Sequence, residues 1–139
     1  MATSGTYDGI WWSVEVPTGW LARADRECAT FQQSPSLGAF QISSARKDSP
    51  ITDSDLKEFA NEQVPQGTPL VGVAYGDFSG FTACYQRDDF MWREWWLRSG
   101  PLMVYATYNV SKNSVRVAVR EQADLEQMLA TLKPKNPSE

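Results

Sequence analysis

The sequence contains no histidine among its 139 residues. This absence excludes Ser-His-Asp and Cys-His catalysis and the histidine-rich metal sites. Only two cysteines are present, Cys28 and Cys84, which are too few to complete a structural zinc site. Both fall in predicted strands and suit a reducing compartment, so we expect two buried thiols. The sequence therefore predicts no metal site and no cofactor.

Phosphate loops and a surplus of positive charge are also missing. The glycines at Gly72 and Gly76 lack the lysine and the following helix that a phosphate loop requires. The Asp53-Ser54-Asp55 run has neither the mid-loop glycine nor the last ligand of a calcium loop, so it predicts helix capping. With a net charge of −4 the chain is acidic, which argues against nucleic acid as a partner.

Long apolar runs are absent as well. No stretch approaches the roughly 20 apolar residues of a membrane-spanning helix. The first residues have neither the basic nor the apolar region of a signal peptide, so we expect a cytoplasmic protein without membrane insertion. The length fits a single domain, 1–139, which we expect to be folded over residues 7–133 with loose tails at 1–6 and 134–139.

Tryptophan, by contrast, is abundant, and three of the six tryptophans lie in residues 90–97. Read as a strand, this segment directs Met91, Arg93, Trp95 and Leu97 to one face. Arg93 there either packs on an indole or anchors an anionic ligand. The residues that alternate with these point to the second face, which is either covered by other elements as core or exposed as an aromatic site. This second face and Trp11, from the strand predicted at 7–16, supply the candidate binding surface: Trp11, Trp92, Glu94, Trp96 and Arg98.

Hydrophobic periodicity and turn residues predict the elements. Strands are predicted at 7–16, 20–23, 28–32, 39–46, 69–75, 81–86, 90–97 and 102–108. Thr52 and Asp55 form a capping box for a helix at about 52–64, and a second helix is predicted at about 118–132. Residues 111–120 are compatible with either a strand or the start of that helix. The sequence thus predicts an α+β protein with a mainly antiparallel sheet of about six to eight strands and two helices.

Five segments in this order carry a resemblance to a known fold: residues 16–20 (VPTGW), 51–56 (ITDSDL), 92–97 (WREWWL), 104–109 (VYATYN) and 128–132 (MLATL). Over roughly residues 7–133 the chain resembles the PsbP/Mog-like fold, especially its small uncharacterised bacterial members. The resemblance implies an α/β/α sandwich around an antiparallel sheet. It also implies a binding or scaffolding role, because members include photosystem assembly subunits, a Ran-GTPase-binding protein and type VI secretion adaptor-chaperones. No common catalytic motif comes with it.

Three functional hypotheses follow. The first is a non-catalytic, protein-binding module that is not an enzyme, of adaptor, chaperone or immunity type, whose partner is another protein. The second is binding or hydrolysis of a small ligand or carbohydrate at Trp92, Glu94 and Trp96 with Asp88, where a carboxylate pair beside stacked indoles would resemble a glycosidase site. The third is a structural role, including a homodimer through an edge strand.

Overall fold

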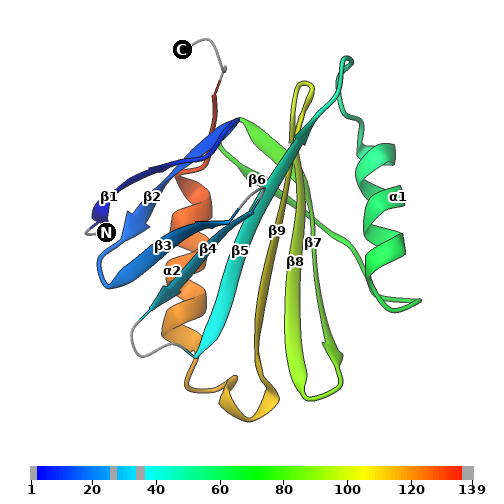
Figure 1. Ribbon diagram of the computed structural model, residues 1–139. Coiled ribbons are helices and arrows are strands. Elements are labelled where there is room, and N and C mark those ends of the chain that lie inside the picture. Colours follow the sequence, from blue (N-terminus) through cyan, green and yellow to red (C-terminus); the bar gives the residue numbers. More distant parts are fainter. Residues whose placement is uncertain (1–2, 26–27, 34–36, 136–139) are drawn as a thin grey trace.

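The computed structural model describes residues 3–25, 28–33 and 37–135 (Figure 1). Two α-helices and ten strands are assigned within this part of the chain. In order they are β1 (Thr3–Asp8), β2 (Trp12–Pro17), β3 (Trp20–Asp25), β4 (Cys28–Gln33), β5 (Gly38–Arg46), α1 (Asp53–Gln63), β6 (Val71–Tyr75), β7 (Phe78–Arg87), β8 (Phe90–Ser99), β9 (Leu102–Ser111), a short 3₁₀ helix (Lys112–Ser114), α2 (Val119–Ala130) and β10 (Lys133–Pro134).

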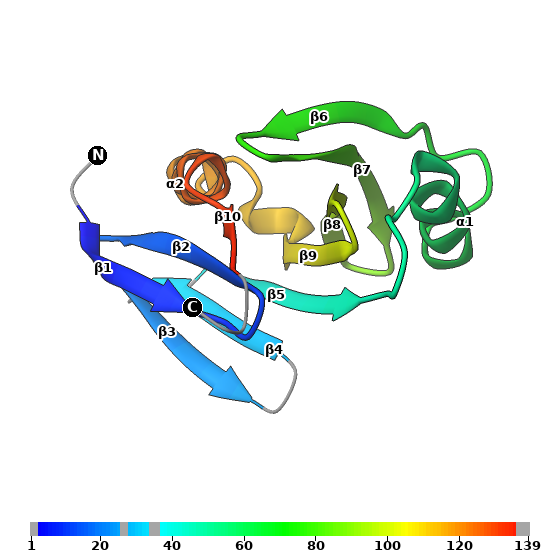
Figure 2. The same cartoon turned by 90° about the horizontal axis from the view of Figure 1, so that it is seen from above.

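Seven of these strands form one sheet in the order β3-β4-β5-β9-β8-β7-β6, and every neighbouring pair is antiparallel. A second sheet contains β1, β2 and β10. Seen from above, the large sheet curls around α2 and the small sheet, whereas α1 lies outside the curl (Figure 2). We call the α2 side the concave face and the α1 side the convex face. The predicted α+β class, with an antiparallel sheet between two helices, is confirmed.

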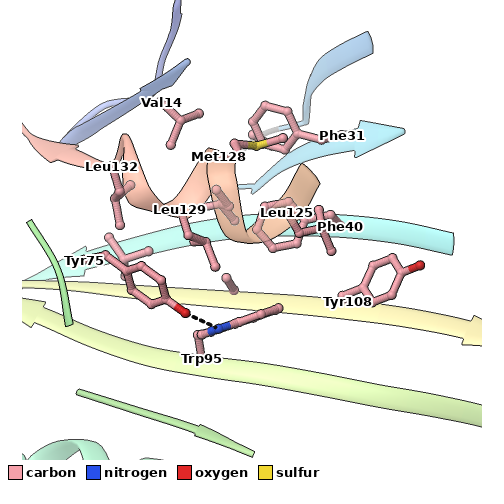
Figure 3. Packing of buried hydrophobic residues seen from close by; sticks show 14 of the residues in the cluster. Val14, Phe31, Phe40, Tyr75, Trp95, Tyr108, Leu125, Met128, Leu129 and Leu132 are labelled. Atoms are coloured by element: carbon pink, nitrogen blue, oxygen red, sulfur yellow. Dashed lines mark hydrogen bonds between the residues drawn. The ribbon is translucent and has the colours of Figure 1, made fainter. Parts of the chain in front are cut away.

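The main core fills the concave side (Figure 3). Trp95 from β8 and Phe40 from β5 meet edge to face, with ring centroids 5.7 Å apart. Leu125 and Leu129 of α2 pack into the same cluster and are almost completely buried. Full burial of one such side chain stabilises a fold by about 1.5–3 kcal/mol. The face of β8 that carries Trp95 and Leu97 therefore lines the main core.

A smaller core lies under α1 on the convex side. Leu56 and Ala60 of the helix pack against Trp96 of β8 and Ala83 of β7. All four are buried. Because successive residues of a strand point to opposite faces, Trp95 and Trp96 fill different cores although they are neighbours in sequence.

The start of α1 follows from the capping box that the sequence predicts. Thr52 Oγ1 accepts a hydrogen bond from the backbone N–H of Asp55 at 3.1 Å, and Asp55 Oδ2 accepts one from the N–H of Thr52 at 3.0 Å. The bond from Thr52, with help from Lys47, holds the pKa of Asp55 below its usual 3.8. Two otherwise unpaired backbone donors are thereby satisfied.

Replacing Thr52 with alanine is expected to lower the free energy of unfolding by about 1 kcal/mol, because the N-cap acceptor is lost. Chemical denaturation of the two proteins measures the difference. Thr18→Ala is the matched control, since Thr18 is an exposed threonine in the β2–β3 turn. An equal effect of both substitutions would contradict the capping role.

The first strand was predicted as one segment, and this prediction is wrong. Residues 3–17 form the hairpin β1–β2 instead, in which the N–H of Gly9 donates to the carbonyl of Trp12 at 2.8 Å. The expected loose tails are also shorter than predicted, since residues 3–6 pair with β2 and Lys133–Pro134 add to its other side. Residues 1–2 and 136–139 lie outside the described part.

Three further details differ from the sequence expectation. Of residues 111–120, whose sequence is compatible with either strand or helix, Ser111 ends β9, residues 112–114 form the 3₁₀ helix, residues 115–118 form turns, and α2 begins at Val119. The connection between the strands predicted at 69–75 and 81–86 is confined to Gly76 and Asp77, because β7 begins at Phe78. Of the two thiols expected to be buried, Cys28 is half-buried and Cys84 is exposed. Period two assigns a side chain to a face but does not tell whether that face is covered.

Candidate binding surface

Two of the five candidate surface residues are buried beneath α1. Trp96 has no exposed surface, and Glu94 is 2% exposed. The indole of Trp96 stacks on the ring of Tyr105 with centroids 6.1 Å apart. A binding surface that includes these two residues is therefore wrong, because α1 covers this part of the convex face.

Glu94 is held by two tyrosines from the neighbouring strands. The hydroxyl of Tyr85 on β7 donates to Oε1, and the hydroxyl of Tyr105 on β9 donates to Oε2. Both side chains flank Glu94 on the convex face because their strands are paired with β8 on either side. A carboxyl group that is buried and occupied in this way has no free oxygen directed at a ligand. Glu94, one of the two acids of the carbohydrate hypothesis, is thus out of reach of solvent, whereas Asp88 is exposed.

Burial also changes the acidity of the tyrosines, because it raises the pKa of their hydroxyl groups. Removal from water raises the pKa of Tyr85 and Tyr105 well above the usual 10.0, and the hydrogen bonds to Glu94 raise it further. Burial and then the bond to Glu121 have the same effect on Tyr108. Burial also raises the pKa of Tyr75, which neighbours Glu126. Four of the five tyrosines therefore stay protonated to unusually high pH.

Alkaline titration should show this directly. Since the folded pKa values lie above that of an exposed tyrosine, their contribution to stability is complete below about pH 10 and is lost as the pH rises further. We expect tyrosinate absorbance to develop late and to coincide with the loss of circular dichroism. Tyrosinate that formed at ordinary pH, ahead of unfolding, would contradict the buried hydrogen bonds.

Arg98 and Trp11 lie in two other places. Arg98 Nε donates to Asp53 Oδ1 at 2.8 Å and so contacts the first turn of α1. Trp11 is the last residue of the β1–β2 turn, and the guanidinium of Arg46 lies 5.0 Å from its ring centroid. Trp11 lines two hollows of about 550 and 290 Å³, and the lining of the smaller one includes Ser99, at the opposite end of β8 from Trp92. The five candidate residues therefore do not form one surface.

Arg93, the arginine on the concave face, is used within the fold. Its guanidinium lies 4.6 Å from the ring centroid of Trp95, and Nη1 is 2.6 Å from Oε1 of Glu126 on α2. Nε donates to Thr82 Oγ1 at 3.2 Å. Of the two alternatives for Arg93, packing on an indole is what the structure contains.

Trp92 is the candidate that remains accessible on the convex face. It is half-buried and lies between Tyr85 of β7 and Asn109 of β9. Phe90, two residues earlier on the same face, is 44% exposed. The guanidinium of Arg87 lies 5.1 Å from the centroid of the Tyr85 ring. These residues make an aromatic group at the end of the sheet that α1 does not cover.

The convex face continues from this group across strands with no helix over them. Figure 1 shows β3, β4 and β5 in front of the core and α1 to one side. Strand register places Arg23, Thr30, Gln41, Thr107 and Glu94 in one row across the sheet. In this row Glu94, Thr107 and Thr30 are buried, whereas Gln41 and Arg23 are exposed.

We call this surface the open face. It comprises Leu21, Arg23, Thr30, Gln41, Ser43, Asn109, Trp92, Phe90 and Arg87. Among these side chains Arg23 and Arg87 are charged, and Gln41 Nε2 donates to Thr30 Oγ1 at 3.2 Å. The sequence signal for it was weak: the polar residues of β4 and β5 alternate with core residues, but nothing in that pattern tells that no helix covers them.

Two negative findings apply to the described residues. Within ranges 3–25, 28–33 and 37–135 no cluster of three or more histidine, cysteine, aspartate or glutamate side chains is arranged to hold a metal ion. In the same ranges, neither helix has the length and apolar character needed to cross a membrane.

Comparison with known proteins places the fold. No protein-family model matches the sequence, and no curated protein matches it. A crystal structure from Bacteroides thetaiotaomicron superposes over 99% of this chain with a TM-score of 0.70 at 16% identity, and this chain spans 50% of that protein. A cyanobacterial PsbP from Synechocystis covers 97% of this chain and 94% of its own, at 9% identity and a TM-score of 0.49.

The yeast Ran-binding protein Mog1p, from Saccharomyces cerevisiae, matches 91% of this chain and 92% of its own length with a TM-score of 0.59 at 8% identity. The fold is PsbP/Mog-like. The resemblance seen in the sequence is thereby confirmed at the level of the fold. At these identities a PsbP/Mog-like fold carries no activity with it.

Proposed function

We propose that this PsbP/Mog-like chain is a non-catalytic protein-binding module and that its partner binds the open face. The carrying observation is a wide sheet face whose charged side chains, Arg23 and Arg87, are both arginines and whose one end carries Trp92 and Phe90. The cores of protein interfaces are depleted in charge and enriched in aromatic residues and arginine. An adaptor, chaperone or immunity-type role fits such a face.

Two further observations support this proposal over the carbohydrate hypothesis. The carboxyl group of Glu94 is occupied by two hydroxyl donors and is 2% exposed, so it cannot protonate a glycosidic oxygen in this arrangement. A structural neighbour of nearly the same length is described as Ran-binding, which makes protein recognition a known use of the fold.

Site-specific photocrosslinking tests where a partner binds. A photoreactive amino acid at Gln41 lies in the middle of the open face, and one at Val117 lies on an exposed residue just before α2. In cells that produce the protein, position 41 should give a discrete crosslinked species that position 117 does not give. Crosslinks that are absent at both positions, or identical at both, would contradict the proposal.

Trp92→Ala should then lower the affinity for the crosslinked partner by about 2 kcal/mol, which is about 30-fold, because a half-buried tryptophan is a typical hot spot. Isothermal titration calorimetry measures the change. Val119→Ala is the control, since Val119 is exposed at the start of α2 and away from the open face. If both variants bound equally well, the aromatic group would not be part of the interface.

A further inference from the structure

β6 is an edge strand of the large sheet. It pairs with β7 on one side, and no other described strand pairs with it on the other. Its five residues are Val71, Gly72, Val73, Ala74 and Tyr75, none of which is charged. An edge without lysine, proline or a bulge is a template for a further strand. The opposite edge, β3, contains Arg23 and Asp25 and so has charges within the strand.

The register with β7 fixes which backbone groups face outward. Tyr75 and Phe78 flank the two-residue turn, so they exchange both backbone hydrogen bonds. Hydrogen-bonded pairs alternate along an antiparallel ladder, so Val71 and Val73 also direct their N–H and C=O groups to β7. The outward groups therefore belong to Gly72 and Ala74. Both residues are exposed and small, which leaves room for another backbone.

We propose that β6 pairs with β6 of a second copy of this chain, antiparallel and about a two-fold axis at Val73. In this register Gly72 of one copy lies opposite Ala74 of the other, and the reverse pair completes the set. Gly72 and Ala74 each lie one residue from Val73. Rotation about the axis therefore places the outward N–H and C=O groups of each residue opposite the outward C=O and N–H groups of the other residue in the second copy. The result is one continuous sheet through both copies, with a self-complementary interface.

The side chains are compatible with this symmetry. Val71, which is 57% exposed, would lie opposite Tyr75 of the second copy, and the two Val73 side chains would meet at the axis. Asp77 would face Pro69 of the second copy, so no like charges are brought together. Apolar pairs of this kind are a usual source of stability between antiparallel strands.

A proline substitution on β6 can disrupt this interface without disrupting the fold of the single chain. Ala74→Pro removes an N–H that faces outward and leaves the hydrogen bonds to β7 intact, as tolerated on edge strands. By sedimentation velocity at increasing concentration, the wild-type chain should approach twice its mass of 15.6 kDa. Ala74→Pro should remain monomeric. Ala22→Pro, at an outward position of β3 by the same alternation, should still dimerise.

Disulfide formation tests the register without proline. In a background with Cys28→Ser and Cys84→Ser, Val73→Cys should oxidise to a covalent dimer, because residues at the axis of a non-hydrogen-bonded pair have Cα atoms about 4.5 Å apart. Val71→Cys should not, because its counterpart lies opposite Tyr75. A wild-type chain that stays monomeric would overturn the proposal. So would a dimer that persists in Ala74→Pro, or preferential crosslinking at position 71. If Ala74→Pro failed to fold, the two cysteine variants would decide.

Discussion

Gly80→Ala is expected to lower the free energy of unfolding by about 3 kcal/mol. Gly80 is buried in β7 where the strand passes under α1. A Cβ at this position would lie 1.9 Å from the backbone oxygen of Trp96 and 3.0 Å from Leu56 Cδ1. The backbone of β8 cannot yield as a flexible side chain can, so the strand pair or the helix must shift.

The control for this experiment is a glycine in the neighbouring strand. A Cβ at Gly72 would meet no atom within 4 Å, and its φ is not in the left-handed region. Gly72→Ala should therefore raise stability by about 0.5 kcal/mol through the reduced freedom of the unfolded chain. Urea denaturation of both variants gives the comparison. If Gly80→Ala were as stable as Gly72→Ala, the close approach of β7 and β8 at this point would be wrong.

The second large effect concerns the carboxyl group beneath α1. Glu94→Ala should destabilise the protein by about 3 kcal/mol, because two partly buried tyrosine hydroxyls lose their acceptor and a cavity remains. Glu94→Gln should have a smaller effect, since its side chain keeps one acceptor and can donate to the second tyrosine. Glu94→Ala should also bring tyrosinate formation to lower pH, because Tyr85 and Tyr105 lose the carboxylate that accepts their hydrogen bonds.

Glu58→Ala supplies the comparison on the exposed surface of α1. Its effect on unfolding should stay within about 0.5 kcal/mol. Thermal and chemical denaturation of the three variants and the wild type rank the effects. An order in which Glu94→Ala matched Glu58→Ala would show that the tyrosine–glutamate–tyrosine group does not stabilise the convex core.

The fold was largely readable because its signals are local. The Thr52–Asp55 capping box fixes the start of α1, and the alternation of residues 90–97 gives the correct two faces of β8. The β1–β2 hairpin was missed because its turn, Gly9 to Trp11, contains two bulky apolar residues that continue a strand pattern. A turn between two strands can be predicted from sequence only when its residues are of the turn-forming types, unlike the apolar residues of the flanking strands.

The candidate site was harder to predict from the sequence, because whether a strand face is covered depends on elements that are distant in sequence. Whether Trp96 or Trp92 is accessible depends on α1, which is about thirty residues away in sequence and spans only part of β8. The hydrogen-bond partners of the buried Glu121 are also distant from it in sequence. Glu121 of α2 accepts bonds from the N–H of Gly38 and the hydroxyl of Tyr108, and no pattern around Glu121 indicates them.

The pairing of β5 with β9 has a consequence for how the chain folds during synthesis. The strands β3 to β5 and β6 to β9 are each joined by short local pairings, and the two halves of the sheet meet only along β5 and β9. Until β9 has been made, the nine-residue β5 has an open inner edge with Phe40 and Ile42 unburied. Completion of the sheet therefore depends on a contact distant in sequence, which typically sets folding times of milliseconds to seconds and makes the nascent first half prone to aggregate.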